Sequence, residues 1–298
     1  MLCYALPRLA FYRYLFTVLR NDSPNICFSH TNPLFVALAE PFLSMRRIAV
    51  VLWYSRQHRG IMTRIAHYFA WRILTSVKEG CASSDPKIIV TGQMVDTKIS
   101  APAVGALKAA PPLFISVGRI TPIKDLMTFV RAAALVRDAG YDMQYACIGP
   151  VLSYDADYYA SLKEEVHRLS LEDRFVFTGP VAYQSMPAEY HRVCIHVNLC
   201  PTGSFDKCVL EAMACGTPSV ATNAAHRNLF GKYAEWLLFR YRDAESLAAA
   251  LIHLLAESPT ALYAMYADLR DMVVRIGSMD SFFRQFRKIV ASAPTWAV

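Results

Sequence analysis

Residues 204–218 read Ser-Phe-Asp-Lys-Cys-Val-Leu-Glu-Ala-Met-Ala-Cys-Gly-Thr-Pro. This pattern predicts a polar loop, a short apolar helix that ends at Gly216, and a strand that begins near Pro218. Glu211 lies inside the helix, where an apolar residue would be expected. A carboxylate at this position can accept two hydrogen bonds from neighbouring hydroxyls, such as those of a ribose. A helix with Glu211 on its solvated face explains the same sequence, so this segment alone leaves both interpretations open.

The segment belongs to a regular alternation of apolar runs typical of strands and stretches with helical periodicity. Because these strands are apolar throughout, they predict a parallel sheet covered on both faces, in which ligands bind beyond the carboxyl ends of the strands. The predicted strands are 113–117, 143–148, 174–178, 195–199, 218–221 and 236–239. The predicted helices are 125–138, 156–169, 186–191, 207–215, 244–255, 260–276 and 279–293.

A stretch rich in Pro and Ala, residues 99–112, separates this half from a first part of the chain. We therefore predict an α/β protein with two domains, residues 1–105 and 106–298, each built on a parallel sheet. In the first part, strands are predicted at 26–28, 48–54, 72–76 and 87–91, and helices at 34–43 and 60–70. A further amphipathic helix, core-facing or on a surface, is predicted from the helical spacing of Leu9, Tyr12, Leu15, Phe16 and Leu19.

The net charge of +7 is concentrated in the first third of the chain, because residues 1–100 hold 12 basic and 5 acidic side chains. Such an excess attracts an anionic surface, either lipid headgroups or nucleic acid. No nucleic-acid motif is recognisable, so lipid is favoured. The arginines are scattered, which is also typical of an ordinary solvated face.

The eight cysteines form no Cys-x-x-Cys pair, and most of them lie in apolar runs. This favours buried thiols in a reducing compartment, hence a cytoplasmic protein, over a disulfide framework. The histidines show no metal-binding spacing, and we expect no metal cofactor.

A second motif, Val-Gly-Arg-Ile-Thr-Pro-Ile-Lys-Asp at 117–125, follows a predicted strand and opens a helix. Gly118 allows a tight turn, and Arg119 and Lys124 place two positive charges near the helix start. This combination suits a diphosphate, although a plain loop with two solvated basic residues has the same pattern. With Glu211 as a ribose ligand, the two motifs together describe a site for a nucleotide diphosphate.

On these motifs, the second half resembles the donor domain of the group 1 (family 4) retaining glycosyltransferases, which have the GT-B fold of two Rossmann-like domains. The matching segments are 117–124, 147–150, 177–181 and 210–218, with weaker similarity at 52–54, 74–80 and 87–96. The resemblance implies transfer of a sugar from a nucleotide-diphosphate donor to an acceptor hydroxyl, with retention and without a metal. It implies Arg119 and Lys124 as catalytic residues and Gly118, Arg119, Lys124, Ser204, Asp206, Lys207 and Glu211 as donor-binding residues.

The chain departs from the family pattern in three places. Gly203 stands where the family has a sugar-contacting Glu, a contact that Asp206, Lys207 or backbone amides would then supply. Arg56 replaces a His of the acceptor domain, for which His58 is a candidate substitute. The N-terminal domain is expected to be incomplete, lacking about one βαβ unit.

These departures keep two alternatives open. The first is a non-catalytic relative that binds nucleotide or a protein partner. The second is a nucleotide-sugar epimerase, for which we find no pair of acid and base residues. For the transferase, the expected partners are a nucleotide-sugar donor, a glycan or lipid-linked acceptor and a membrane surface touched by the basic N-terminal half, with no nucleic acid.

Overall fold

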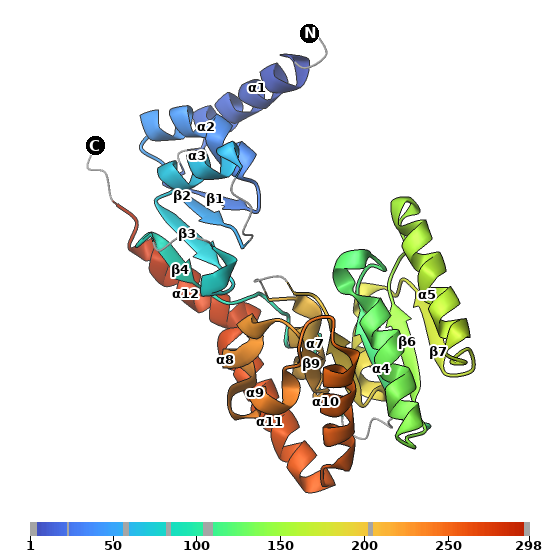
Figure 1. Ribbon diagram of the computed structural model, residues 1–298. Coiled ribbons are helices and arrows are strands. Elements are labelled where there is room, and N and C mark those ends of the chain that lie inside the picture. The colour runs from blue at the N-terminus through green and yellow to red at the C-terminus, as the bar shows by residue number, and fades with distance from the viewer. Residues whose placement is uncertain are drawn as a thin grey trace. The chain divides into compact units, whose positions relative to one another are not determined.

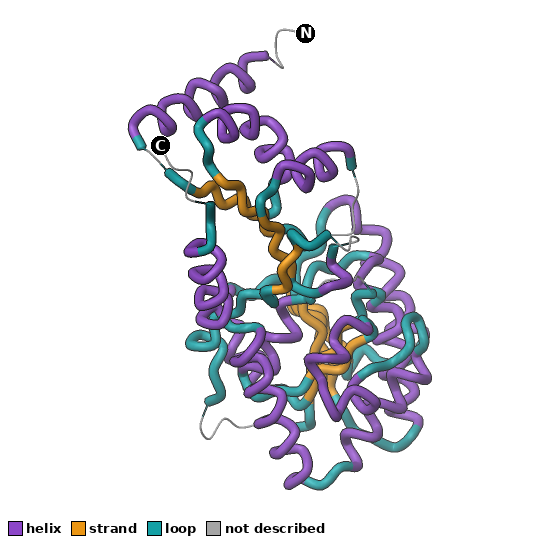
Figure 2. Tube along the Cα trace, turned by 90° about the vertical axis from the view of Figure 1, so that its left-hand side faces the viewer, coloured by secondary structure: helices purple, strands orange, loops and turns teal. Residues whose placement is uncertain are grey.

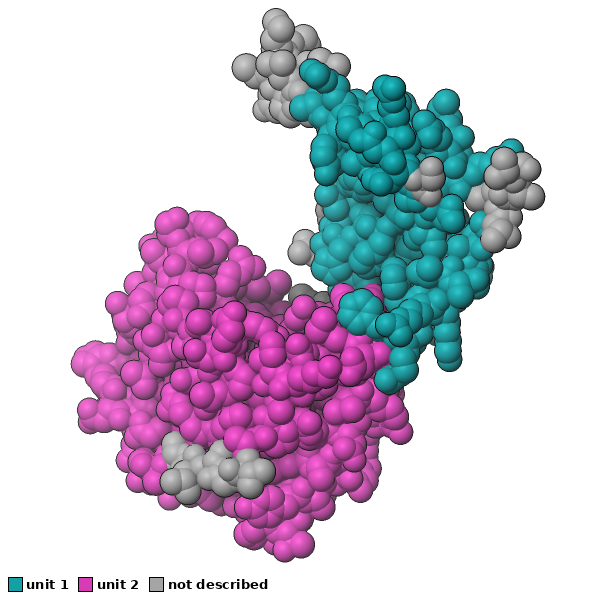
Figure 3. All heavy atoms as spheres, turned by 180° about the vertical axis from the view of Figure 1, so that it is seen from behind, with its two compact units in different colours: residues 1–92, 283–298 teal, residues 93–282 magenta. Residues whose placement is uncertain are grey.

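The computed structural model describes residues 5–22, 24–55, 60–81, 85–103, 110–201 and 205–294. The chain divides into two compact units, residues 1–92 with 283–298, and residues 93–282 (Figure 3). This grouping differs from the predicted division, which gave all the terminal helices to the second domain. The residues from Phe283 onward belong with the first unit, where the ring of Phe286 packs edge-on against Phe28 with 5.0 Å between centroids.

The first unit contains a four-stranded parallel sheet in the order β1–β2–β3–β4 (Figure 1). Every residue of β2 is buried, which is why the sequence there is a continuous apolar run. Of the stripe predicted near the N-terminus, Leu15 and Leu19 are buried in the core of this unit and Tyr12 packs against it, whereas Phe16 is 50% exposed. The elements are α1 (Ala5–Asn21), β1 (Ile26–His30), α2 (Pro33–Met45), β2 (Ala49–Trp53), α3 (Ile61–Phe69), β3 (Arg72–Thr75), the 3₁₀ turn η2 (Lys78–Gly80) and β4 (Ile88–Val90).

The second unit contains a five-stranded parallel sheet in the order β7–β6–β5–β8–β9. The chain moves outward from β5 through β6 and β7 and then continues on the other side of β5. The carboxyl ends of β5 and β8 therefore lie at the switch point of the sheet, where doubly wound folds bind their ligands. The strands are β5 (Leu113–Val117), β6 (Gln144–Ile148), β7 (Phe175–Gly179), β8 (Ile195–Asn198) and β9 (Ser219–Ala221).

Helices flank these strands, as the tube in Figure 2 shows. They are α4 (Leu126–Asp138), α5 (Ala156–Arg168), α6 (Met186–Arg192), α7 (Lys207–Ala214), α8 (Arg227–Phe230), α9 (Ala234–Leu237), α10 (Ala244–Ala256) and α11 (Pro259–Ile276). The last helix, α12 (Met279–Ala291), belongs from Phe283 onward to the first unit. The 3₁₀ turns are η3 (Pro122–Lys124), η4 (Ser153–Asp155), η5 (Tyr183–Ser185), η6 (Ala224–His226) and η7 (Gly231–Tyr233). Among the described helices, none alone is long and apolar enough to cross a membrane, and only the pair α10 and α11, bent by 114°, passes that test together.

The predicted α/β class with two parallel sheets is confirmed, but the strand predicted at 236–239 is wrong. Residues Ala234–Leu237 form the short helix α9, which the Leu238 amide closes by donating to Ala234. Beside β9, this segment forms one parallel bridge, between Leu238 and Ala221. The apolar run is buried by the helix rather than by extended pairing, and hydrophobicity alone does not distinguish these two solutions.

Candidate functional site

Three glycines form the floor of the candidate site at the ends of β5, β6 and β7. The Gly118 amide donates to the Ile148 carbonyl and the Gly149 amide to the Gly179 carbonyl, each over 2.9 Å. Gly149 has φ +153°, and a Cβ there would overlap the carbonyl oxygen of Gly118. Only glycine allows the two loops to approach this closely. The missing side chains thus let the loops after β5 and β6 pack directly against each other.

Lys124 crosses this floor. It ends the turn η3 between β5 and α4, and a Cβ at Gly118 would lie only 3.1 Å from its Cε atom. The lysine side chain is 17% exposed and its ammonium pairs with the carboxylate of Asp206. The sequence predicted both residues for the donor site, and the fold brings them together from positions 82 residues apart.

Asp206 is also tied to the sheet. Its Oδ2 atom accepts a hydrogen bond of 3.0 Å from Nδ2 of Asn198, the buried last residue of β8. Asn198 was not among the predicted site residues. Its signal in the sequence is a polar side chain at the end of an otherwise buried strand, beside the predicted loop.

The protonation of the pair follows from its surroundings. Burial disfavours the charged amine, but Cys208 and Asp206 together hold the pKa of Lys124 above its ordinary value. Because burial keeps the pKa of the Cys208 thiol well above its ordinary value, the thiol is neutral at neutral pH and Asp206 is the effective anion. Burial also opposes ionisation of Asp206, yet Lys124 and the hydrogen bond from Asn198 keep the pKa of Asp206 below its ordinary value. The pair is therefore ionic at neutral pH.

Glu211 is a buried carboxylate in α7, 9% exposed, which excludes the solvated-face interpretation. Burial raises the pKa of Glu211, and Asp206 raises it further against the opposing effect of Lys207. A buried carboxylate is costly unless hydrogen-bond donors reach it. Ribose hydroxyls are suitable donors for this group.

The remaining predicted residues are less closely grouped. Arg119 is exposed, and its Nη1 atom donates to the hydroxyl of Tyr154 on η4 over 3.4 Å rather than joining the Lys124–Asp206 pair. Lys207 is exposed at the start of α7. The other sequence-based candidates, Ser204, Gly203, Arg56 and His58, lie outside the described residues.

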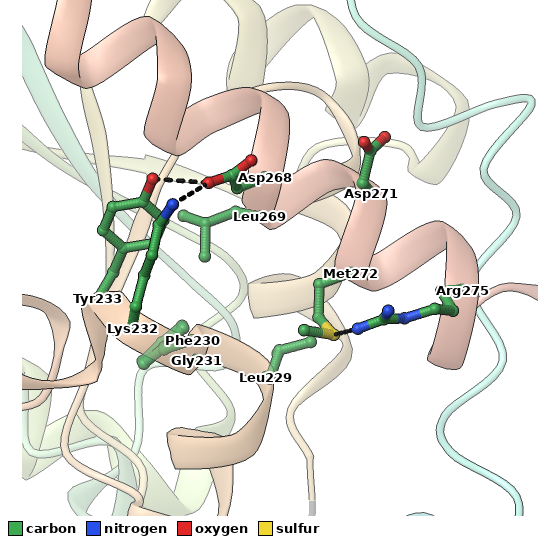
Figure 4. A pocket seen from close by; sticks show the side chains of 10 residues that line it. All are labelled: Leu229, Phe230, Gly231, Lys232, Tyr233, Asp268, Leu269, Asp271, Met272 and Arg275. Atoms are coloured by element: carbon green, nitrogen blue, oxygen red, sulfur yellow. Dashed lines mark hydrogen bonds and ion pairs between the residues drawn. The ribbon is translucent and has the colours of Figure 1, made fainter.

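A hollow of about 360 Å³ lies elsewhere on the second unit (Figure 4). Its wall carries a cluster in which Asp268 accepts from Tyr233 over 2.7 Å and pairs with Lys232 at 2.8 Å. None of the predicted donor residues that the structure describes lines it. The hollow and the predicted donor residues thus lie at different places on the second unit. The candidate site is assigned to the donor residues because they lie at the switch point of the sheet.

Two Rossmann-like parallel sheets, with glycine turns and a partly buried lysine at the switch point of the second, are typical of the GT-B fold. Residues 111–257 match the family model of the glycosyl transferases group 1. The match covers just under half of the chain, and it supports the resemblance to the group 1 glycosyltransferases seen in the sequence.

Two curated relatives and a solved structure illustrate the similarity. The 2-deoxystreptamine glucosyltransferase of Streptomyces kanamyceticus is 28% identical over 205 residues, 62% of this chain and 50% of the relative. The D-inositol 3-phosphate glycosyltransferase of Kineococcus radiotolerans is 30% identical over 151 residues, 46% of this chain and 35% of the relative. The chain thus spans half or less of the length of these curated relatives.

The structure of Anabaena Alr3699/HepE in complex with UDP matches with a TM-score of 0.79. The match covers 94% of this chain and 81% of the Anabaena chain at 14% identity, so it shows the fold alone. Other structures of the same relative hold UDP with glucose, or UDP-glucose.

Proposed function

We propose that this protein transfers a sugar from a uridine-diphosphate donor to an acceptor hydroxyl, with retention at the anomeric carbon. The observation that carries the proposal is the partly buried ionic pair of Lys124 and Asp206 at the switch point, with the buried carboxylate of Glu211 in the same sequence segment as Asp206. The match of residues 111–257 to the group 1 glycosyltransferase model supports sugar transfer, and the UDP complexes of the structural relative support the choice of nucleotide.

In this proposal the protein stabilises charge on the leaving group. Lys124 and Arg119 neutralise the diphosphate as the bond to the sugar breaks, which stabilises the transition state more than the bound donor. Glu211 accepts hydrogen bonds from the ribose hydroxyls and fixes the nucleotide. These basic side chains do the work that a metal ion does in other transferases, so no metal is part of the scheme. We assign no protein nucleophile.

A glycan or lipid-linked molecule is the proposed acceptor, used at the cytoplasmic face of a membrane. This part of the proposal is supported by the excess of basic residues in the first third of the chain. It is also supported by large apolar side chains exposed on α1 and α3, namely Tyr14 (73%), Ile61 (66%) and Tyr68 (75%).

Nucleotide binding tests the donor site directly. At a UDP concentration of 100 times Kd, we expect the unfolding midpoint to rise by about 5 °C. Arg119→Ala and Glu211→Gln should lose most of this rise, because they remove contacts to the diphosphate and the ribose. The exposed residues Arg287 and Glu164 provide matched controls, and Arg287→Ala and Glu164→Gln should keep the full rise.

The outcomes separate the steps of the proposal. The absence of a shift with both UDP and GDP would overturn the donor site. A shift without any donor hydrolysis or transfer would instead identify a nucleotide-binding protein without catalytic activity.

A further inference from the structure

Asp206 makes two contacts that decide its role. One joins it to the ammonium of Lys124, and the other joins its Oδ2 atom to Asn198 on the sheet. Its side chain is 27% exposed, so most of the carboxylate faces protein rather than solvent. The sequence pattern offered Asp206, alongside Lys207 and backbone amides, as a substitute for the sugar-contacting Glu that Gly203 replaces. The contacts in the structure point to a different task.

A lysine is a poor fixed charge unless something holds it. Its four-carbon stem has several rotatable bonds, and ordering it costs conformational entropy. Here the lysine side chain packs over Gly118, which has no Cβ to obstruct it, and its ammonium is held by Asp206. Asn198 in turn fixes the carboxylate to β8. The three residues form a chain of contacts from the sheet to the ammonium.

The charges argue in the same direction. A carboxylate next to a bound diphosphate repels it, and this repulsion is tolerable only while the carboxylate is paired. Because Asp206 is paired with Lys124, the lysine offsets the repulsion between this carboxylate and a diphosphate. A residue with this arrangement contributes by fixing its partner.

We propose that Asp206, anchored by Asn198, is a positioning residue that holds Lys124 across Gly118 before the donor binds, and that it does not contact the transferred sugar. This inference rests on the proposed donor function of the site. It adds Asn198 to the site and gives Asp206 a role that acts through Lys124.

The first test examines the pair without any nucleotide. The pKa of the Lys124 ammonium, followed by NMR of ¹⁵N-labelled lysine in the full chain, should be above its ordinary value in the wild type. It should fall in Asp206→Asn, because burial then acts on the amine without the compensating carboxylate. Asn198→Ala, which leaves the charges in place, should produce a smaller fall. An unchanged pKa in Asp206→Asn would overturn the pairing.

The second test distinguishes positioning from sugar contact by comparing Kd values for UDP and UDP-glucose. If Asp206 acts through Lys124, Asp206→Asn should change both Kd values by the same factor. In Lys124→Met the unpaired Asp206 should repel the diphosphate, so adding Asp206→Asn to that variant should tighten UDP binding again by about tenfold. A selective loss of UDP-glucose affinity in Asp206→Asn, with UDP unaffected, would overturn the proposal in favour of a sugar contact.

The two tests also separate this inference from the proposed function. If the wild type binds neither UDP nor UDP-glucose, the donor function fails while the NMR measurement still reports the pair. If the wild type binds both and the double variant shows no recovery, the donor site stands and the positioning role fails. Unfolding midpoints of all variants identify any that do not fold.

Discussion

At the scale of single residues, the site depends on what glycine permits. Gly149 combines a left-handed backbone with a Cβ position that the Gly118 carbonyl already occupies. Gly140, in the turn after α4, has φ +90° but open space around its missing Cβ. A side chain at Gly140 would therefore meet backbone strain alone, whereas one at Gly149 would meet both strain and a steric overlap.

We expect Gly149→Ala to lower the free energy of unfolding by at least about 3 kcal/mol. The new Cβ would overlap the Gly118 carbonyl, in addition to the strain of a positive φ angle at a residue with a side chain. Gly140→Ala should cost only about 1 kcal/mol, the strain of the left-handed conformation alone. Urea unfolding of both variants measures the difference. Equal losses would contradict the close approach of the two loops.

The sequence was informative about residue types and less so about their partners. Glu211 stands out in the sequence because a carboxylate interrupts an apolar helix, and it is indeed buried. Asn198 does not stand out, because its importance comes from a hydrogen bond to Asp206 that only the folded sheet creates. The pairing of Lys124 with Asp206 is equally invisible, since each residue alone resembles a solvated loop charge.

At the scale of elements, the alternation of strands and helices was predictable because buried strands need uninterrupted apolar runs. The strands found in the structure lie within two residues of the predicted ones. The failure at 236–239 arises because a short apolar run is buried equally well by a helix. Strand order was not predictable from periodicity, because the reversal at β5 depends on crossover connections.

The contact between α4 and α5 supplies an acid-sensitive link. Glu165 accepts hydrogen bonds from Arg168 and, across the two helices, from Arg131. The pKa of Glu165 is lowered to about 2, mainly by the hydrogen bond from Arg168. Burial acts in the opposite direction and raises the pKa, while Arg131 lowers it further. A carboxyl with a depressed folded-state pKa stabilises the fold above its ordinary pKa, and this contribution disappears as the pH falls.

We therefore expect wild type to be more stable than Glu165→Gln at pH 7, with the difference shrinking as the pH falls from about 4.5 to about 2. Urea unfolding at a series of pH values measures it. The exposed neighbour Glu164 provides the control, and Glu164→Gln should show no such pH dependence. A difference that grows toward low pH would contradict the assignment.

The first helix makes a second testable contact. Leu19 is 4% exposed in the core of the first unit, whereas Tyr14 on the same helix is 73% exposed. Leu19→Ala should destabilise that unit by about 2–4 kcal/mol because it leaves a cavity, and Tyr14→Ala should change its stability by less than about 0.5 kcal/mol. Hydrogen exchange of the β1 and β2 amides reports the unit separately. Equal protection in both variants would indicate that α1 does not contribute to the core.

At the scale of the whole molecule, the uneven charge distribution makes a prediction about surfaces. All of the net charge of +7 lies within residues 1–100. We expect the protein to float with vesicles that contain anionic lipid and not with neutral ones. The bound fraction should fall as the salt concentration rises, because screening shortens the range of the attraction.

Apolar contact and charge can be separated in the same experiment. Tyr68→Ser removes an exposed ring from α3 without changing the net charge, and it should weaken binding at every salt concentration. Binding to neutral vesicles that is insensitive to salt would contradict the electrostatic part of the proposal.

The distance in sequence between Lys124 and Asp206 has a consequence for how the protein matures. The two residues are 82 positions apart, and β8 and its loop are made after β5, β6 and β7. During synthesis the lysine therefore emerges long before its partner, and the growing chain carries an uncompensated charge at the end of β5. A nascent chain that stops before Asp206 holds the glycine floor and the lysine but not the pair. Capacity to bind the nucleotide should accordingly arise in one late step, when the second unit closes around β8.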